Sequence, residues 1–288
     1  MAEYRLARLL SFLTLFLIML GGFVHNTGSS LACPDWPLCY GTLFPAMTGG
    51  VQYEHSHRVL AAAIGLLIIA LTVLIFRRRP DPASKILSSV ALFLVVFQGI
   101  LGGLTVIYRL PMLVSVAHLA TSMIFFLLMV TLTHRLSPAY QPPVQRRCRV
   151  TALVALAVYL QMLLGALVRH TGSGLACLEI PLCQGSLWPA GASGVLQLHM
   201  AHRIGALIVA TLVLLWSVVA WCRVKRVRED IPALFALPFL LVLLEVTLGL
   251  LSVATQLGIW SVTFHLGVGA ALLASLWWLF LNSGKSNS

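Results

Sequence analysis

Four histidines recur at matched places in the sequence, and their imidazoles are the groups best suited to hold a metal. They are His57, His118, His202 and His265. Each falls about one to two helical turns inside the same end of an apolar segment, so all four should lie at similar depth in a membrane. Two histidines from neighbouring helices at one depth are the geometry of bis-axial haem ligation. The alternative is that they only form hydrogen bonds between helices.

A carboxylate accompanies one of these histidines. Glu54 lies three residues before His57. His199 lies three residues before His202 in the same way, and this spacing puts both members of a pair on one helical face. Glu54 is therefore a candidate catalytic group, as a base or as a group that stabilises positive charge. The alternative is that Glu54 only benefits from its place at a helix N-terminus.

A second acidic residue, Glu245, lies past the middle of another apolar segment, and Gln98 is its counterpart. A charged carboxylate near the centre of a bilayer costs about 2.5–3.5 kcal/mol. We therefore expect Glu245 to be protonated or paired inside the helix bundle. An interhelical hydrogen bond is favoured over a role in a proton path.

Membrane helices must position these residues. The chain is 59% hydrophobic and 9% charged, whereas a soluble domain is about 25% charged. Its apolar segments are continuous and reach the roughly 20 residues that a helix needs to cross a bilayer, unlike barrel strands. We expect an all-α integral membrane protein with eight transmembrane helices. The expected spans are about 6–24, 54–76, 85–107, 112–133, 150–168, 198–222, 232–254 and 259–282.

The chain contains an internal duplication. Segment 21–33 matches 165–177, segment 37–39 matches 181–183, and the helices that carry the four histidines match in pairs. Each repeat covers an even number of spans, so both halves should insert in the same orientation. We expect two tandem pseudo-symmetric four-helix bundles, 1–140 and 141–288. Because 21–39 recurs, we expect the first span to belong to the fold rather than to a signal peptide.

Lysine and arginine indicate the orientation. Most of the 19 basic residues fall at the termini or in alternate connections, which places both termini in the cytoplasm and the long loops, about 25–53 and 169–197, outside. The net charge of +11 is thus a topology signal and an attraction to anionic lipid, and does not indicate a nucleic-acid partner. The basic residues on the predicted cytoplasmic side are Arg5, Arg8, Arg77, Arg78, Arg79, Lys85, Arg135, Arg146, Arg147, Arg149, Arg223, Lys225, Arg226, Arg228 and Lys285.

Two cysteine pairs lie in the outward loops, each with a proline two residues before the second cysteine. They are Cys33/Cys39 and Cys177/Cys183. An oxidising exterior favours disulfides, mainly as structural links, with a redox role open for the first. Zinc is less favoured because a closed site takes four ligands. We expect Cys148 and Cys222, at the cytoplasmic boundary, to be free thiols.

A minority of basic residues lie at the outer boundary, away from the predicted cytoplasmic side, and need another explanation. They are Arg58, Arg109, Arg169 and Arg203. Haem propionates would provide one through charge-assisted hydrogen bonds. Lipid phosphates reached by snorkelling side chains are the alternative.

The combination of motifs resembles the haem A synthase family over all eight spans. The motifs are Gly-x-x-x-Arg-x-Thr-Gly-Ser-Gly-Leu-x-Cys at 165–177, Cys-Pro-Asp-Trp-Pro-Leu-Cys at 33–39, Glu54-x-x-His57-Arg58, His118, His202 and His265. Three departures concern propionate contacts: His25 replaces an arginine, Ser30 replaces a glycine, and the second loop lacks Asp-Trp.

The resemblance implies oxidation of the C8 methyl of haem O to the formyl of haem A by successive hydroxylation, for use in cytochrome oxidase. It implies a resident haem b on His202 and His265 in the C-terminal half, substrate haem O at His57 and His118 in the N-terminal half, and Glu54 as the functional carboxylate. It also implies loop disulfides and haem sites toward the outer face of the cell's inner (plasma) membrane. Implied partners are the haem O synthase, which is a farnesyltransferase, an electron acceptor and membrane lipid; a homo-oligomer stays open.

Two other functional classes compete with this interpretation. A diheme b-type electron carrier would place one haem near each face of the membrane, whereas the four histidines share the outer end. A haem transporter or chaperone would need the broken helices of alternating access, which the sequence does not show.

Overall fold

The computed structural model describes residues 1–288 except 80, 143–147, 226–231 and 284–288. The helices are α1 (Ala2–Asn26), α2 (Gly50–Arg78), α3 (Pro82–Ile107), α4 (Met112–Leu136), α5 (Arg149–His170), α6 (Gly194–Lys225), α7 (Pro232–Ala254) and α8 (Ile259–Asn282), with a short 3₁₀ helix η1 (Ser173–Leu175). Among the described residues, eight helices are long and apolar enough to cross a membrane, which confirms the predicted fold class. Of the residues used for orientation, Arg146, Arg147, Arg226, Arg228 and Lys285 lie outside the described part.

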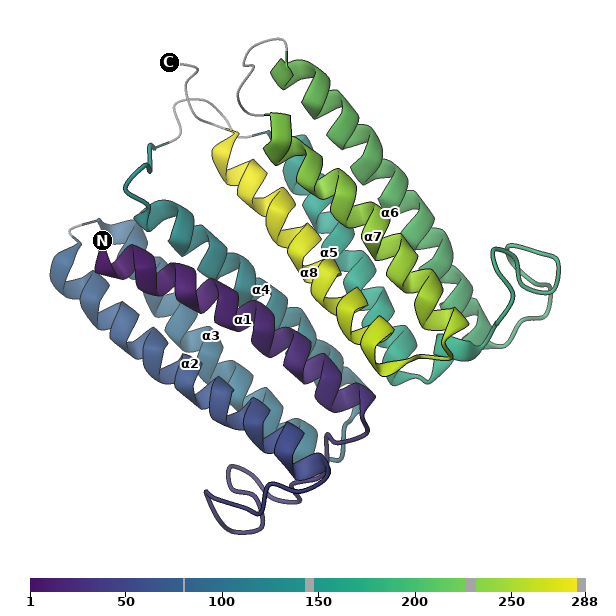
Figure 1. The fold of residues 1–288 in the computed structure, drawn as a ribbon, viewed down its shortest axis with the longest axis horizontal. Helices are drawn as coiled ribbons and strands as arrows, with labels where there is room; N and C mark the ends of the chain where they lie inside the picture. The colour runs from purple at the N-terminus through teal and green to yellow at the C-terminus, as the bar shows by residue number, and fades with distance from the viewer. Residues whose placement is uncertain (80, 143–147, 226–231, 284–288) are drawn as a thin grey trace. The chain divides into compact units, whose positions relative to one another are not determined.

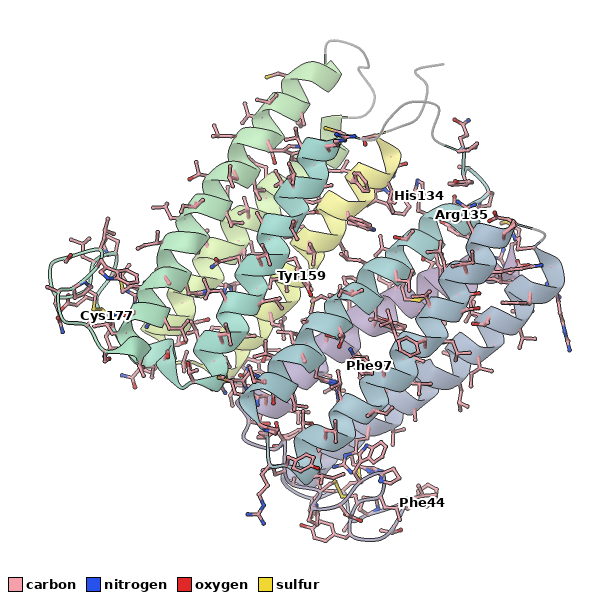
Figure 2. All side chains as sticks on the ribbon, turned by 180° about the vertical axis from the view of Figure 1, so that it is seen from behind. Phe44, Phe97, His134, Arg135, Tyr159 and Cys177 are labelled. Atoms are coloured by element: carbon pink, nitrogen blue, oxygen red, sulfur yellow. A yellow bond between two sulfur atoms is a disulfide. The ribbon has the colours of Figure 1, made fainter. Side chains whose placement is uncertain are left out.

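The chain divides into two compact units, Met1–Pro142 and Pro143–Ser288. In the first unit each helix packs against the next, and α1 also packs against α4, so the four helices form a closed ring. Helices α5 to α8 form a ring of the same kind. The long loops, 27–49 and 171–193, lie at the end of their own unit where the first helix ends (Figure 1). Figure 2 shows Phe44 in the first of these loops and Arg135 at the opposite end of the same unit.

Each ring has a narrow core and an apolar outer surface, as expected for helices that face lipid. In the first unit the core includes Leu10, Ile68 and Leu132, which are fully buried. Phe12 and Phe93 project outward, and 66% of each residue is exposed. Lipid chains can cover such side chains because the helices satisfy their own backbone N–H and C=O groups.

Helices α1, α2 and α6 begin about one turn earlier than hydropathy predicts, and the last two follow the long loops. Helix α2 starts at Gly50 and α6 at Gly194, whereas the apolar stretches begin near residues 54 and 198. The added turns contain polar side chains, which a hydropathy pattern does not assign to a span. As a consequence, Glu54 lies in the second turn of α2 and is only 4% exposed. A favourable position in the first turn of a helix therefore does not explain this residue.

Asp81 fixes the connection between α2 and α3. Its carboxylate accepts hydrogen bonds from the backbone N–H groups of Ala83 and Ser84, and Pro82 occupies the first helical position, where an N–H is not needed. The guanidinium of Arg135 on α4 donates to both carboxylate oxygens, at 2.7 and 2.9 Å. These hydrogen bonds hold the pKa of Asp81 below its usual range. The pair therefore joins the start of α3 to the end of α4.

Replacement of Asp81 should separate its two roles. Asp81→Asn keeps a good helix cap but loses the ion pair, and Asp81→Ala loses both, with about 1 kcal/mol attributable to the cap. We expect the melting temperature in detergent at pH 7 to fall in the order parent, Asn, Ala. Because folding lowers the pKa of Asp81, its ion-pair contribution is present above the unfolded value of about 3.9 and is lost as the pH falls below it. The gap between parent and Asn should therefore close in acid, and equal melting at pH 7 of all three proteins would contradict this account.

Candidate haem sites

Each unit contains two of the recurring histidines, on helices that lie across the ring from each other. His57 belongs to α2 and His118 to α4, and each lies about two turns after the start of its helix. They are close enough to interact electrostatically. The prediction of neighbouring helices is wrong, because α2 packs against α1 and α3, and α4 against α3 and α1. In a four-helix up-and-down ring, helices two apart in sequence start at the same end and lie on a diagonal.

His202 on α6 and His265 on α8 repeat this arrangement in the second unit. They also lie close enough to interact electrostatically. In both units the histidines lie toward the end that carries the long loop. Two imidazoles at one depth on opposite helices of a bundle are residues that would hold a haem iron.

A glycine on the preceding helix makes room for each imidazole of the first unit. A Cβ at Gly21 of α1 would stand 3.0 Å from Cε1 of His57. A Cβ at Gly102 of α3 would stand 3.6 Å from Cε1 of His118. The ring of His57 thus occupies space that a side chain at Gly21 would need, whereas the ring of His118 lies at an ordinary van der Waals distance from a Cβ at Gly102.

The second unit contains the same pair of contacts, and they are tighter. A Cβ at Gly165 of α5 would stand 2.9 Å from Cε1 of His202. A Cβ at Gly249 of α7 would stand 3.2 Å from Cε1 of His265. Interiors this closely packed accept little added volume, so glycine is required at Gly165 unless the ring moves.

The Nδ1 atoms of these rings have different neighbours in the two units. In the first unit both Nδ1 atoms are buried without a hydrogen-bond partner among the described residues. In the second unit, the side-chain amide of Gln161 lies 2.9 Å from Nδ1 of His202. A carboxylate oxygen of Glu245 lies 3.1 Å from Nδ1 of His265. Glu245 on α7 thus pairs with His265 on α8, which is the interhelical contact that its position in the sequence favours.

These surroundings fit ligation of a haem iron. Across the described part of the chain, no hydrogen bond is formed by the Nε2 atom of any of the four rings, and none of these atoms is closed off from the surface. The Nε2 edge is therefore available to a metal, while the glycine contacts hold the ring from the side. The residues present therefore fit a bis-histidine haem, which the two imidazoles of each unit would hold.

Glu54 joins α2 to the first long loop. Its Oε1 accepts a hydrogen bond from Arg58, one turn later, and its Oε2 accepts from the backbone N–H of Cys33 at 2.8 Å. Arg58 also donates to the carbonyl groups of Cys33, Asp35 and Leu38. Both carboxylate oxygens are thus engaged. A carboxylate has about four lone-pair sites, so Glu54 keeps acceptor sites through which it could act as a base toward a water.

His199 takes the place of Glu54 in the second unit. Nε of Arg203 donates to Nε2 of His199 at 3.1 Å, and the other guanidinium nitrogens donate to the carbonyls of Cys177 and Glu179. The second unit therefore has the same helix-to-loop anchor without a carboxylate. Arg58 and Arg203 direct most of their donors to loop carbonyls, and propionate binding by either stays a prediction.

Both outer cysteine pairs are disulfides, as the sequence predicts. They are Cys33–Cys39 and Cys177–Cys183. His55 lies beside the first disulfide, but sulfur atoms bonded to each other are not thiolates, so this group is not a zinc site. Cys148 and Cys222 are exposed and lie outside these disulfides.

Matching acidic residues shape the two loops. Asp35 accepts hydrogen bonds from the N–H groups of Gly41 and Tyr40, and these hold the pKa of Asp35 below its usual value. Glu179 accepts from the N–H of Gln184 at 2.7 Å in the same part of the second loop. The second loop has therefore lost the Asp-Trp motif but has kept the acceptor that folds it.

Trp36 makes the first loop a cover for its bundle. Its indole lies against Gly103 of α3, where a Cβ would stand 2.8 Å from Cδ2. The two remaining candidate arginines lie at the same end of their units. Arg109 is exposed in the α3–α4 turn with φ of 55°, and Arg169 is half-buried at the end of α5. Their part in propionate binding stays a prediction.

The glycine contacts and the amide of Gln161 beside His202 were not predicted from the sequence. The glycines carried a signal, because those of the first unit recur at matching places in the second. Gln161 carried none, since its counterpart is Leu17. The contact of Trp36 with α3 could not be read from the loop sequence alone.

Comparison with known proteins gives a consistent result. A family model described as cytochrome oxidase assembly protein (COX15-CtaA) matches residues 4–52 and 50–277. A haem A synthase of Shouchella clausii is 31% identical, covering 94% of this chain and 92% of that protein. Haem A synthases of Symbiobacterium thermophilum (32% identical, 88% of this chain and 90% of that protein) and Shewanella oneidensis (31%, 94% and 93%) match similarly.

Gly165→Ala should disturb haem binding in the second unit. The added methyl group would stand 2.9 Å from Cε1 of His202, so the ring must leave its position. We expect haem affinity of the purified protein to fall about tenfold or more, measured as haem bound per protein during dilution. Gly99→Ala is the control, because a Cβ there meets nothing within 4 Å. Equal haem retention by the two variants would refute the role of the glycine.

Proposed function

The chain belongs to the haem A synthase family of cytochrome oxidase assembly proteins, and on that premise we propose that it oxidises the C8 methyl group of haem O to the formyl group of haem A. It is a multi-pass membrane protein. We place it in the cell's inner (plasma) membrane, with both termini in the cytoplasm and the haem sites toward the outer face. With water as the oxygen source, each methyl group consumes one water and releases four electrons and four protons. An external electron acceptor takes up the electrons.

One observation carries the division of labour within this proposal. The two units hold the same histidine pair but differ in the residue one turn before the first histidine, which is Glu54 in the first unit and His199 in the second. A group that can exchange a proton belongs with the haem that reacts. We therefore assign substrate haem O to His57 and His118, and a resident haem b to His202 and His265.

The residues of the first unit suit oxidation of a methyl group by water. A resident haem b would supply one-electron transfer when bound. Glu54 lies one turn from His57 toward the long loop, and its remaining lone pairs can take a proton from a water. The disulfide loop, with Trp36 against Gly103, limits the access of other water to this end of the bundle.

The competing functions are less well supported. A diheme electron carrier that spans the membrane needs ligands near both ends, whereas both recurring histidines of each unit lie toward the loop end. A transporter needs broken helices. The helices of the described ranges run without interruption, and α7 continues through Pro238.

Alanine substitutions in the two histidine pairs should have different effects on haem content and haem A formation. His202→Ala or His265→Ala should remove the resident b-type haem, while His57→Ala or His118→Ala should abolish haem A formation and leave that haem bound. The measurement is chromatography of extracted haems after expression with and without the haem O-forming farnesyltransferase. The unsubstituted protein should yield haem A only with that enzyme. Equal loss of b-type haem from all four variants would overturn the assignment.

Glu54→Gln should keep the fold and the b-type haem but lose haem A formation. General acid–base catalysis contributes about 10²–10⁴-fold to a rate, so the loss of haem A formation should be large. Glu54→Asp should retain part of the activity because it keeps a carboxylate. Because Glu54 also anchors the first loop, the melting temperature of each variant separates loss of chemistry from loss of structure. Near-parental haem A in Glu54→Gln, in the ratio of haem O to hydroxylated haem to haem A, would show that the carboxylate is only structural.

A further inference from the structure

We propose that Glu245 is a positioning residue for the haem of the second unit. Through Nδ1 of His265 it fixes the imidazole with Nε2 toward the iron, and its negative charge lowers the reduction potential of that haem. The inference rests on the proposed assignment of a resident haem to His202 and His265, and it explains why that haem would stay bound while the other one turns over.

The carboxylate of Glu245 lies in contact with the imidazole of His265. Oε1 of Glu245 on α7 lies 3.1 Å from Nδ1 of His265 on α8. The distance is that of a hydrogen bond, although the ring is not turned to align one, and both Nδ1 and Oε2 are buried with no hydrogen-bond partner in the described ranges. A small rotation of the ring satisfies a buried donor with a buried acceptor, which avoids a desolvation cost of about 1–3 kcal/mol.

A glycine on α8 leaves space for the carboxylate of Glu245. Gly269 lies one turn after His265 on the same helix, and a Cβ there would stand 2.8 Å from Oε1 of Glu245. The matching residues of the first unit are Gln98 and Ser122. The amide of Gln98 donates to Thr121 of α4 rather than to His118. The carboxylate and the glycine that accommodates it therefore occur together, and only in the second unit.

The other histidine of the second unit has a neighbour of the same kind. Gln161 lies against Nδ1 and the carbonyl oxygen of His202, at 2.9 and 2.8 Å. A Cβ at Gly205 would collide with its amide oxygen. The matching residues of the first unit, Leu17 and Leu60, both pack in the apolar cluster there. A polar partner with its own space-making glycine is thus added twice to the second unit.

Of these two partners, only the carboxylate dictates which ring nitrogen carries the proton. The amide nitrogen of Gln161 faces Nδ1 of His202 and also donates to the carbonyl oxygen of that residue, so in this orientation it does not hold a proton on Nδ1. A carboxylate only accepts, so Glu245 requires the proton on Nδ1 of His265 and leaves Nε2 for the iron. A negative charge paired with the ligand also makes the imidazole more basic, which stabilises the ferric state.

A purely structural tie between helices would not need this charge. Gln98 and Thr121 connect α3 to α4 with neutral side chains at the matching level. A carboxylate within a span costs about 2.5–3.5 kcal/mol on insertion, which a glutamine would avoid. A carboxylic side chain placed against a ring nitrogen, where the other unit pairs an amide with a hydroxyl, therefore points to a role toward the haem ligand.

The test is a redox titration of the full-length protein in detergent, followed by its haem absorbance. A His118→Ala background restricts the signal to the second unit. We expect Glu245→Gln to raise the equilibrium constant for one-electron reduction about tenfold, which corresponds to about 59 mV. Glu245→Asp should lie between Gln and the parent. Gln98→Ala, at the matching position of the first unit, is the control and should leave the potential unchanged.

The outcomes separate this inference from the proposed function. An unchanged potential in Glu245→Gln overturns the inference, even if the unsubstituted protein makes haem A. A raised potential supports it, even if no haem A is made, in which case the proposed function fails alone. If Glu245→Gln does not fold, Gly269→Ala displaces the carboxylate while keeping it, and an unchanged potential in that variant also overturns the inference.

Discussion

The contact between an imidazole and a glycine on the preceding helix is the constraint on which the rest of the structure depends. Hydrocarbon offers no water to a histidine, so each ring must be held inside the bundle. Glycine lets two helices approach while the ring fills the space between them. The contact occurs at each of the helix pairs α1/α2, α3/α4, α5/α6 and α7/α8. It therefore sets both the depth of the four rings and the partner of each histidine-bearing helix.

On this common frame the two units differ in where they place a carboxylate. Glu54 lies near the long loop, where it is buried and paired with Arg58 and a backbone N–H. Glu245 lies deeper in its span, beside Nδ1 of a candidate ligand. A carboxylate near water can transfer protons, whereas one inside the bundle mainly holds a charge in place. In the proposed division of roles, the same residue type would serve a reacting haem in one unit and a resident haem in the other.

The sequence was sufficient for features that depend on composition and repetition. The eight spans follow from continuous hydropathy, and the disulfides follow from cysteine spacing in loops that also carry matched turns. It was insufficient where packing decides. The first turns of α2 and α6 are polar, so hydropathy missed them, and with them the burial of Glu54. The diagonal placement of His57 and His118 depends on ring closure by α1 and α4, which no local pattern records. Gln161 has no counterpart in the repeat, so only its contact with His202 identifies it.

The arginines that follow two of the histidines show how the loops and the haem sites are connected. Arg58 and Arg203 each bind carbonyl groups of their disulfide loop, and each also binds the side chain one turn earlier on its helix. Because each arginine is adjacent to a candidate iron ligand, it ties the disulfide loop to the helix that carries that ligand. This anchor is the same in both units, so it belongs to the frame rather than to the chemistry. The chemistry proposed for the first unit would then depend on what differs there, which is the carboxylate of Glu54 and the indole of Trp36 that covers its end of the bundle.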